Sequence, residues 1–79
     1  MTSMAAKAFV LIETEVNKTR KFISECRQLK GVQSVDAVTG PYDVIAVIEG
    51  ADLSAVGDLV TSKIHPIAGI SRTVTCLAV

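Results

Sequence analysis

Hydrophobic positions along this chain change period from strand-like to helix-like and back, and they do so twice. Residues 8–12 form a short, continuous apolar run rich in strand-forming side chains, which predicts a buried strand. The apolar positions that follow recur at helical spacing and form one stripe, made of Phe22, Ile23, Cys26 and Leu29. Gly31 stands where a glycine commonly ends a helix, so we expect a helix over residues 17–30.

The middle of the chain has the pattern of a β-hairpin. Residues 32–39 mix valines with polar side chains, which predicts a more exposed strand, and the strand stops at the turn dipeptide Gly40-Pro41. Residues 44–48 form a second strand that is apolar at every position. We therefore expect a hairpin that turns across residues 40–42.

The last third of the chain predicts a helix and a strand. Asp52 is a suitable N-cap, and Pro66 places the end of the helix near residue 64 or 65. Gly57 lies inside this helix, where glycine costs roughly 1 kcal/mol relative to alanine, so we expect close packing there. Residues 70–79 are rich in β-branched side chains and predict a final strand. The expected apolar face of the helix comprises Leu53, Val56, Leu59, Val60 and Ile64.

The resulting order of elements is β-α-β-β-α-β, which is the ferredoxin-like plan of the α+β class. The two halves also resemble each other, because an Ile-Glu pair ends the first strand and recurs at the end of the third. Right-handed crossovers place both helices on one face of an antiparallel sheet, with the first and third strands in the middle.

Those two central strands are apolar on both faces. A sheet covered by helices on one side needs apolar residues on that side only. In the first strand, however, Phe9 and Leu11 alternate with residues 8, 10 and 12, which are also apolar. In the third strand, Ile45 and Val47 alternate in the same way with the apolar residues 44, 46 and 48. An uncovered apolar face of that size is a liability for a monomer. We therefore predict a homodimer in which two sheets pack face to face, which makes a dimeric α+β barrel.

Length and composition agree with a small domain that needs a partner. The 79 residues leave room for one core, and a chain of this size buries roughly 60% of its unfolded surface. A hydrophobic fraction of 49% excludes disorder. Two cysteines and one histidine cannot make a disulfide framework or a four-ligand zinc site. Because neither disulfides nor zinc can stabilise this small core, we expect another subunit to do so.

Charge and targeting signals narrow the partners and the compartment. Eight basic and eight acidic residues give zero formal net charge, which argues against broad attraction to nucleic acid or an anionic membrane. No apolar run approaches the ~20 residues of a membrane helix, and residues 1–4 lack the apolar stretch of a signal peptide. We expect a cytoplasmic protein in which Cys26 and Cys76 are reduced, buried and act as small hydrophobes.

Several stretches together resemble a known domain. They are Leu29-Lys30-Gly31-Val32, the Val-Thr-Gly-Pro-Tyr-Asp stretch of residues 38–43, the Gly-Ile that ends residues 64–70, and Arg72-Thr73-x-Thr75. The chain resembles the RAM domain (regulation of amino acid metabolism), the effector-binding half of the leucine-responsive regulatory protein (Lrp)/AsnC family of transcription factors. The resemblance covers essentially the whole chain, and residues 38–43 are its most specific part.

This resemblance implies a small-molecule sensor, commonly for amino acids, and no cofactor. The ligand would sit between dimers and shift the balance between a dimer and an octamer or ring. Only about seven residues precede the first strand, so we expect residues 1–79 to be a single domain without a helix-turn-helix. Such a stand-alone member would modulate transcription or metabolism, alone or by hetero-association with full-length regulators, without binding DNA itself and without a membrane partner.

The hairpin carries groups that suit a free amino acid. Asp43 offers a carboxylate for an ammonium group, Gly40 permits close backbone approach, and Tyr42 supplies a ring with a polar tip. Pro41 departs from the family pattern, stiffens the turn and removes a backbone donor. By resemblance, with the last-strand residues as weaker candidates, the expected ligand-binding residues are Thr39, Gly40, Pro41, Tyr42, Asp43, Ser71 and Thr73.

Two other functions remain open. A small dimeric α+β barrel enzyme, such as a monooxygenase or isomerase, would need His65, the one side chain that titrates near neutral pH. No nucleophile adjoins a histidine and no phosphate loop is present, so we expect no enzyme and no metal site. A purely structural oligomerisation partner would use the same fold without a ligand.

The first helix carries five basic residues with Glu25 among them, and we interpret this charged side as a face exposed to solvent.

Overall fold

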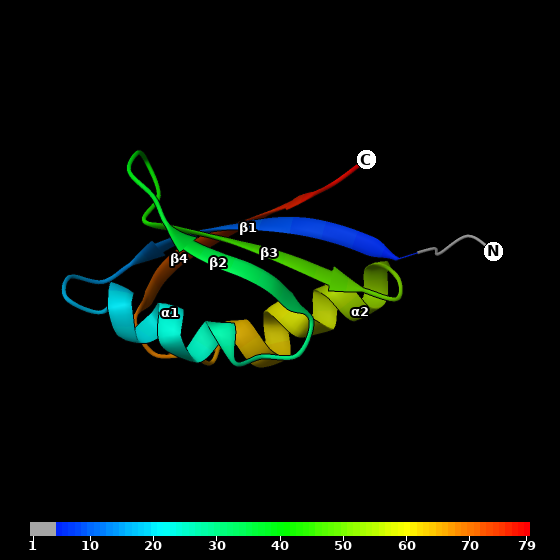
Figure 1. The fold of residues 1–79 in the computed structure, drawn as a ribbon, viewed down its shortest axis with the longest axis horizontal. Coiled ribbons are helices and arrows are strands. Elements are labelled where there is room, and N and C mark those ends of the chain that lie inside the picture. Colours follow the sequence, from blue (N-terminus) through cyan, green and yellow to red (C-terminus); the bar gives the residue numbers. More distant parts are fainter. Residues whose placement is uncertain (1–4) are drawn as a thin grey trace.

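The computed structural model describes residues 5–79, and residues 1–4, which bear on the signal-peptide argument, lie outside it (Figure 1). Over the described residues the order of strands and helices is the expected β-α-β-β-α-β. The elements are β1 (Ala6–Thr14), α1 (Thr19–Arg27), β2 (Val32–Ala37), β3 (Val44–Gly50), α2 (Leu53–Asp58) with the π-helical extension η1 (Leu59–Ile64), and β4 (Ile70–Leu77).

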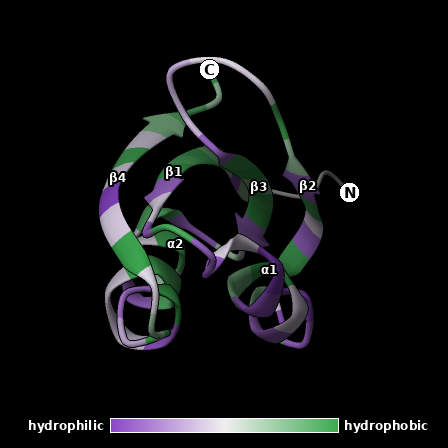
Figure 2. Ribbon diagram, turned by 90° about the vertical axis from the view of Figure 1, so that its left-hand side faces the viewer, coloured by the Kyte–Doolittle hydropathy of each residue, from purple (hydrophilic) through white to green (hydrophobic). Residues whose placement is uncertain are grey.

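The strands form one antiparallel sheet in the order β2-β3-β1-β4. This order confirms the ferredoxin-like fold and places the two doubly apolar strands in the centre. Both helices lie against the same face of the sheet, and the hairpin between β2 and β3 projects from its other side (Figures 1 and 2).

The closed face of the sheet, which the helices cover, forms the core. Its strand positions are alternate residues of the two central strands with Val35 of β2, and Phe22 and Cys26 of α1 pack among them. Burial of a large aliphatic side chain contributes about 1.5 to 3 kcal/mol, so this face supplies most of the stability of the chain. The strand side chains of the closed face are Ala8, Val10, Ile12, Val35, Val44, Ala46 and Ile48.

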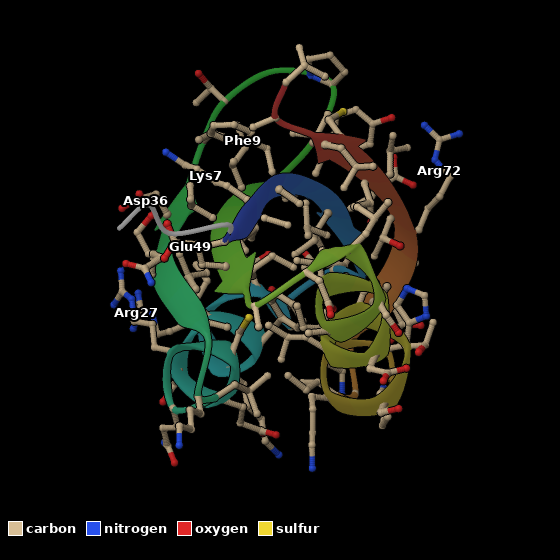
Figure 3. All side chains as sticks on the ribbon, turned by 90° about the vertical axis from the view of Figure 1, so that its right-hand side faces the viewer. Lys7, Phe9, Arg27, Asp36, Glu49 and Arg72 are labelled. Atoms are coloured by element: carbon tan, nitrogen blue, oxygen red, sulfur yellow. The ribbon has the colours of Figure 1, made fainter. Side chains whose placement is uncertain are left out.

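The open face of the sheet carries apolar side chains that no element of the described chain covers. Register pairs Phe9 with Val47 and with Cys76, and Leu11 with Ile45 and Val74, so these side chains share one face. Phe9 is 37% exposed and Val74 is 38% exposed. Figure 3 shows Phe9 on the side of the sheet away from the helices. We call Phe9, Leu11, Ile45, Val47, Val74 and Cys76 the open face.

Charged residues frame the open face at one end. Lys7 and Glu49 are cross-strand partners, and the Lys7 ammonium lies 5.4 Å from the centre of the Phe9 ring (Figure 3). Gln33 donates to Glu49 at 3.4 Å. The apolar centre with a charged rim is the composition expected of a surface that binds another protein.

The first helix is shorter than the 17–30 that its pattern predicts. Asn17 has a φ of 66°, which lies in the left-handed region and keeps it out of the helix, and Lys18 takes the N-cap position. Arg27 is the last helical residue, because the chain leaves the helix through a turn over residues 28–31. Gly31 has a φ of 96°, so it ends this turn rather than the helix itself.

The second helix begins as predicted, and its middle differs. Asp52 caps it, because its carboxylate accepts the N–H of Ala55 at 2.8 Å. The helix widens to a π turn in which the N–H of His65 bonds the Val60 carbonyl at 2.9 Å. Leu53 is 58% exposed, so its expected place on the buried face is wrong. The expected close packing at Gly57 is also wrong, because open space surrounds the position of a Cβ there.

The two cysteines differ in their environment. Cys26 is fully buried in the core, as expected, whereas Cys76 is exposed, so its expected burial is wrong for the chain by itself. The reason is the direction of the side chain, since Cys76 pairs with Phe9 and shares the open face.

No helix among the described residues has the length and apolar character needed to cross a membrane.

Candidate functional site

The hairpin between β2 and β3 holds five of the seven expected ligand-binding residues. Ala37 pairs with Val44, and the N–H of Val38 donates to the carbonyl of Asp43 at 2.9 Å, which closes the base of the loop. Gly40 has a φ of 138°, a conformation that favours glycine, and the position of a Cβ there meets no atom within 4 Å. Glycine is therefore favoured at position 40 by the backbone conformation and not by a lack of space for a side chain.

Thr39, Gly40 and Pro41 are exposed at the tip of the hairpin, whereas Tyr42 and Asp43 are half-buried near its base. The tip therefore presents backbone and small side chains, and the chemically distinctive groups lie where the loop meets the sheet. In Figure 1 the loop rises from the end of the sheet that lies above the start of α1.

Asp43 fastens the hairpin to the end of β1. Its Oδ2 accepts the backbone N–H of Thr14 at 2.9 Å and the Thr14 hydroxyl at 3.4 Å, and its own N–H donates to the Ile12 carbonyl at 2.9 Å. The Thr14 hydroxyl also lies 2.6 Å from that of Thr19. One carboxylate oxygen is therefore committed to structure, and within the described residues Oδ1 has no hydrogen bond.

Tyr42 forms a pair with Arg72 from β4. The guanidinium Nη2 donates to the Tyr42 hydroxyl at 3.1 Å, and the guanidinium carbon lies 5.6 Å from the centre of the ring. This pair brings a fixed positive charge to the hairpin, which the sequence reasoning did not foresee. A signal was present in Arg72-Thr73-x-Thr75, but only the register of β4 on β1 identifies the arginine as the residue in contact.

The two weaker candidates on β4 do not join the hairpin within one chain. Thr73 pairs with Ile12 and faces the helices, where its hydroxyl lies 3.1 Å from Nε2 of His65. Arg72 pairs with Glu13 and faces the opposite side. Ser71 is exposed at the irregularity between β1 and β4. The described chain thus assembles residues 39–43 with Arg72 and leaves Ser71 and Thr73 apart from them.

Titration and metal chemistry add little at this site. Burial raises the pKa of the Cys26 thiol to about 11, and this thiol lies in the core rather than at the hairpin. The described residues hold no group of three or more His, Cys, Asp and Glu side chains able to bind a metal ion.

A cleft of about 540 Å³ lies between the end of α1 and the second helix, and it bears on the enzyme alternative. Leu29, Gly31 and Leu59 contribute to its lining, and His65 does not. His65 is exposed and bonds Thr73 instead. The histidine that the enzyme alternative requires is therefore not placed in this cleft.

Comparisons with known proteins agree with this architecture. The family model described as the Lrp/AsnC ligand binding domain matches residues 7–79. The crystal structure of TTHA0845 from Thermus thermophilus is similar over 94% of this chain and 92% of that chain, with 36% identity and a TM-score of 0.89. The comparison with curated protein sequences gives no match.

Two larger regulators share the fold at lower identity. AsnC of E. coli is 19% identical over 94% of this chain and 50% of that chain, with a TM-score of 0.88. The transcriptional regulator NMB0573 of Neisseria meningitidis, in complex with L-Met, is 20% identical over 94% of this chain and 49% of that chain, with a TM-score of 0.83. This chain therefore spans about half the length of each regulator.

Proposed function

Because this chain belongs to the Lrp/AsnC ligand-binding domain family, we propose that it binds a small-molecule effector and changes its assembly in response. The proposed effector is an amino acid, and the proposed contact residues are the hairpin residues 39–43, with Ser71 and Thr73 of β4 completing the site from a neighbouring copy. L-methionine is included among the first ligands to test, because the N. meningitidis regulator forms a complex with it.

The observation that carries this proposal is that the base of the hairpin holds an anionic and a cationic group at adjacent residues, the carboxylate of Asp43 and the guanidinium that Arg72 directs at Tyr42. A free amino acid presents an ammonium and a carboxylate group, so its site needs an anion and a cation on one wall. Asp43 offers Oδ1 for the ammonium, and Arg72, held by Tyr42, offers guanidinium donors for the carboxylate. Their placement supports an amino-acid ligand over a purely apolar one.

The proposed assembly begins with a homodimer in which two open faces pack together. The apolar centre of the open face and its charged rim support this mode. Dimers would then associate into an octamer or ring with the ligand between them. Thr73 and the hairpin face opposite sides of one sheet, so a site that used both would need residues from more than one chain.

The same proposal covers partners and compartment. Zero formal net charge supports a module that does not bind DNA by itself, and hetero-association with full-length regulators would connect it to transcription. Both cysteines are free thiols, which supports a reducing compartment such as the cytoplasm. The family is a ligand-binding domain, so we propose binding rather than catalysis as the function.

A structural oligomerisation partner is the second candidate function, and Pro41 favours it. Proline fixes φ and removes one backbone donor from the exposed tip of the hairpin, which reduces the number of groups available to a ligand. This candidate gives the same assembly with no change in the presence of amino acids.

Native mass spectrometry of the full chain, with and without a mixture of the common amino acids including L-methionine, tests these alternatives. We expect a dimer-based assembly that gains the mass of an amino acid or changes size. The Asp43→Asn variant keeps an oxygen that accepts the Thr14 N–H and removes the negative charge, so it should abolish the gain in mass from a bound amino acid. Asp58→Asn, at an exposed position of α2, is the control and should leave that gain unchanged. An assembly that ignores every amino acid would favour the structural partner.

A further inference from the structure

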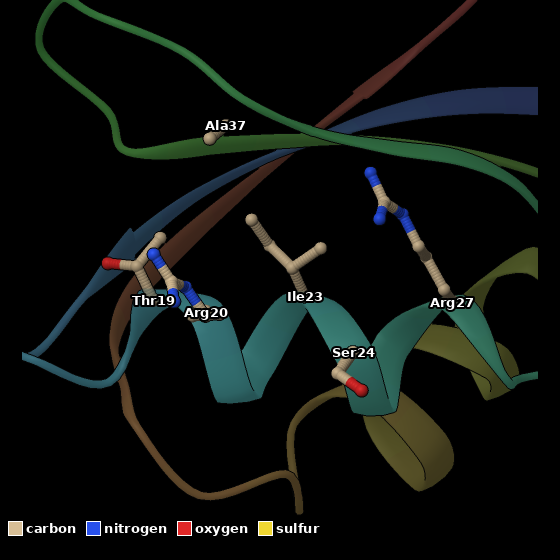
Figure 4. Close-up of a pocket in the computed structure, with 6 residues that line it drawn as sticks. All are labelled: Thr19, Arg20, Ile23, Ser24, Arg27 and Ala37. Atoms are coloured by element: carbon tan, nitrogen blue, oxygen red, sulfur yellow. The ribbon is translucent and has the colours of Figure 1, made fainter.

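A second cleft, separate from the tip of the hairpin, lies between α1 and β2 and has a volume of about 600 Å³. Figure 4 shows its floor on α1 and its opposite wall at Ala37, the last residue of β2. Its lining residues are Thr19, Arg20, Ile23, Ser24, Arg27 and Ala37. None of them belongs to the expected ligand-binding set.

Helical spacing brings two arginines into this cleft with an apolar residue between them. Arg20, Ile23 and Arg27 stand at positions i, i+3 and i+7, which share one face of a helix. Figure 4 shows Ile23 and Arg27 directed toward β2 and Arg20 beside Thr19 at the start of α1. Seven residues at 1.5 Å each separate the two arginine backbones by about 10 Å along the helix axis. The cleft therefore has a cationic group at each end and the Ile23 side chain in the middle.

The guanidinium groups of Arg20 and Arg27 both keep N–H donors that bond no described residue. Arg27 directs Nε and Nη2 at the Val35 carbonyl, at 3.2 and 2.8 Å, which fixes its plane and leaves three of its five N–H donors. Arg20 makes no hydrogen bond and no ion pair with any described residue. Neither arginine is within ion-pair distance of a described carboxylate, although Asp36 lines an adjoining hollow that shares Arg27.

The surroundings add positive charge rather than cancel it. Lys18 at the N-cap and Lys21 in α1 lie on either side of Arg20 in the sequence, and Glu25 is the one acidic residue of α1. No acidic residue lies in the first turn of the helix. The solvated-face interpretation agrees with the exposure of Lys18 and Lys21, but Arg20 and Arg27 line a shaped cleft with hydroxyl groups at Thr19 and Ser24.

We propose that this cleft binds a small organic anion through Arg20 and Arg27, with the carbon skeleton of the ligand against Ile23 and Ala37. Carboxylate and phosphate are the groups that arginine binds best, because its planar fork matches their oxygens. Two arginines at opposite ends favour a ligand with two anionic groups over a ligand with one. The cleft is lined by none of the residues proposed to bind the amino acid.

The test is a titration of the uniformly ¹⁵N-labelled full chain, followed by ¹H–¹⁵N correlation spectra at constant ionic strength. The probes are sodium glutarate, with two carboxylates, sodium butyrate, with one, and inorganic phosphate, with sodium chloride as the reference. We expect saturable shifts of the Arg20, Ile23, Arg27 and Ala37 amides, with glutarate binding more tightly than butyrate. A tighter response to phosphate than to glutarate would assign the site to a phosphate group instead of a carboxylate.

Matched variants decide whether the cleft is responsible. Arg20→Gln and Arg27→Gln should each weaken glutarate binding roughly tenfold, because each removes a charge-assisted contact. Lys21→Gln removes the same charge from an exposed position that does not line the cleft, and it should leave affinity unchanged. Arg20 bonds no described residue, so its variant remains informative even if Arg27→Gln disturbs β2.

The opposite results would overturn the proposal. Shifts that grow linearly with every salt, or an equal loss of affinity in Lys21→Gln, would mean general screening of the charge on α1. The Tyr42→Phe variant separates this site from the hairpin of residues 39–43, because the Tyr42 hydroxyl bonds Arg72 and neither residue lines the cleft, so glutarate binding should persist whether or not amino acids bind. Loss of glutarate binding in that variant would also contradict a separate site.

Discussion

The two faces of the sheet differ in what covers them, although the same strands build both. On the closed face, Ile12 and Ile48 are fully buried beneath the helices. On the open face, Phe9 and Val74 keep more than a third of their surface exposed. Alternate side chains of one strand point to opposite faces, so this difference arises within single strands. The comparison shows that apolar content does not by itself bury a residue, because a covering element must also be present.

The described residues cover one face of the sheet only. Both helices lie on the closed face, and the other described segments outside the strands are turns, the hairpin and the ends of the chain. A second copy of the same chain can cover the open face without any further element, and it would do so symmetrically. In that case, side chains of the two faces should differ in their effects on folding and on association.

The largest expected effect comes from a pair of isoleucines on β3 that face opposite sides. Ile48→Ala should lower the free energy of unfolding by about 3 to 4 kcal/mol, because it leaves a cavity in a fully covered core. Ile45→Ala should cost about 1 kcal/mol in the monomer, since Ile45 is half-exposed. Urea denaturation at a concentration low enough to keep the chain monomeric measures both. Equal losses would mean that the two faces are covered alike.

The next effect concerns association. Val74→Asp should weaken the proposed dimer by roughly a hundredfold, because it would place a carboxylate in the apolar interface between two open faces. Val16→Asp is the matched control, since Val16 is 85% exposed in the turn before α1 and away from the open face. Sedimentation velocity over a range of concentrations gives the two dissociation constants. If both variants associate like the wild type, sheet pairing is not the mode of assembly.

The two cysteines report on the two faces separately. Cys26 should react with a thiol reagent at pH 8 only through unfolding, because burial removes access and raises its pKa to about 11. Cys76 should react rapidly in dilute solution and more slowly as the concentration rises, because dimerisation would cover the open face. Rates measured with Cys26→Ala and Cys76→Ala assign each phase. A Cys76 rate independent of concentration would argue against cover by a second copy.

The raised pKa of Cys26 also makes stability depend on pH. The unfolded thiol ionises near its ordinary value of 9.0, whereas the folded thiol stays neutral up to about 11. The free energy of unfolding therefore contains the full contribution of the neutral Cys26 thiol below pH 9, and this contribution falls as pH rises toward 11. Cys26→Ala should show a shallower loss of stability than the wild type across that window, as measured by urea denaturation. Identical slopes would mean that the thiol is not desolvated in the folded chain.

The smallest expected effect lies on the helix that covers the closed face. Gly57→Ala should raise the free energy of unfolding by about 0.5 to 1 kcal/mol, because the site is exposed, helical and open. Gly50→Ala should lower it, since a Cβ there would lie 3.0 Å from the Ala55 Cβ and 3.1 Å from the Val56 nitrogen. Thermal unfolding distinguishes the two signs. Destabilisation by Gly57→Ala would mean that this helix packs on another surface.

The sequence by itself determined the local structure of this protein. Asp52 caps the second helix as its position predicts, the order of elements is as expected, and the two doubly apolar strands are central. These features depend on neighbouring residues and on a repeating period, which a sequence displays directly. The resemblance carried by residues 38–43 likewise identified the family, because the motif is local.

The tertiary structure alone decided which distant groups meet. Asp43 bonds Thr14 across 29 positions, and Arg72 reaches Tyr42 across 30. Arg20 and Arg27 look like part of a solvated helix face until β2 supplies the other wall of a cleft. Cys76 follows the same rule, because only the register of β4 on β1 turns it to the open face. Contacts of this kind depend on strand register and packing, and no local period encodes them.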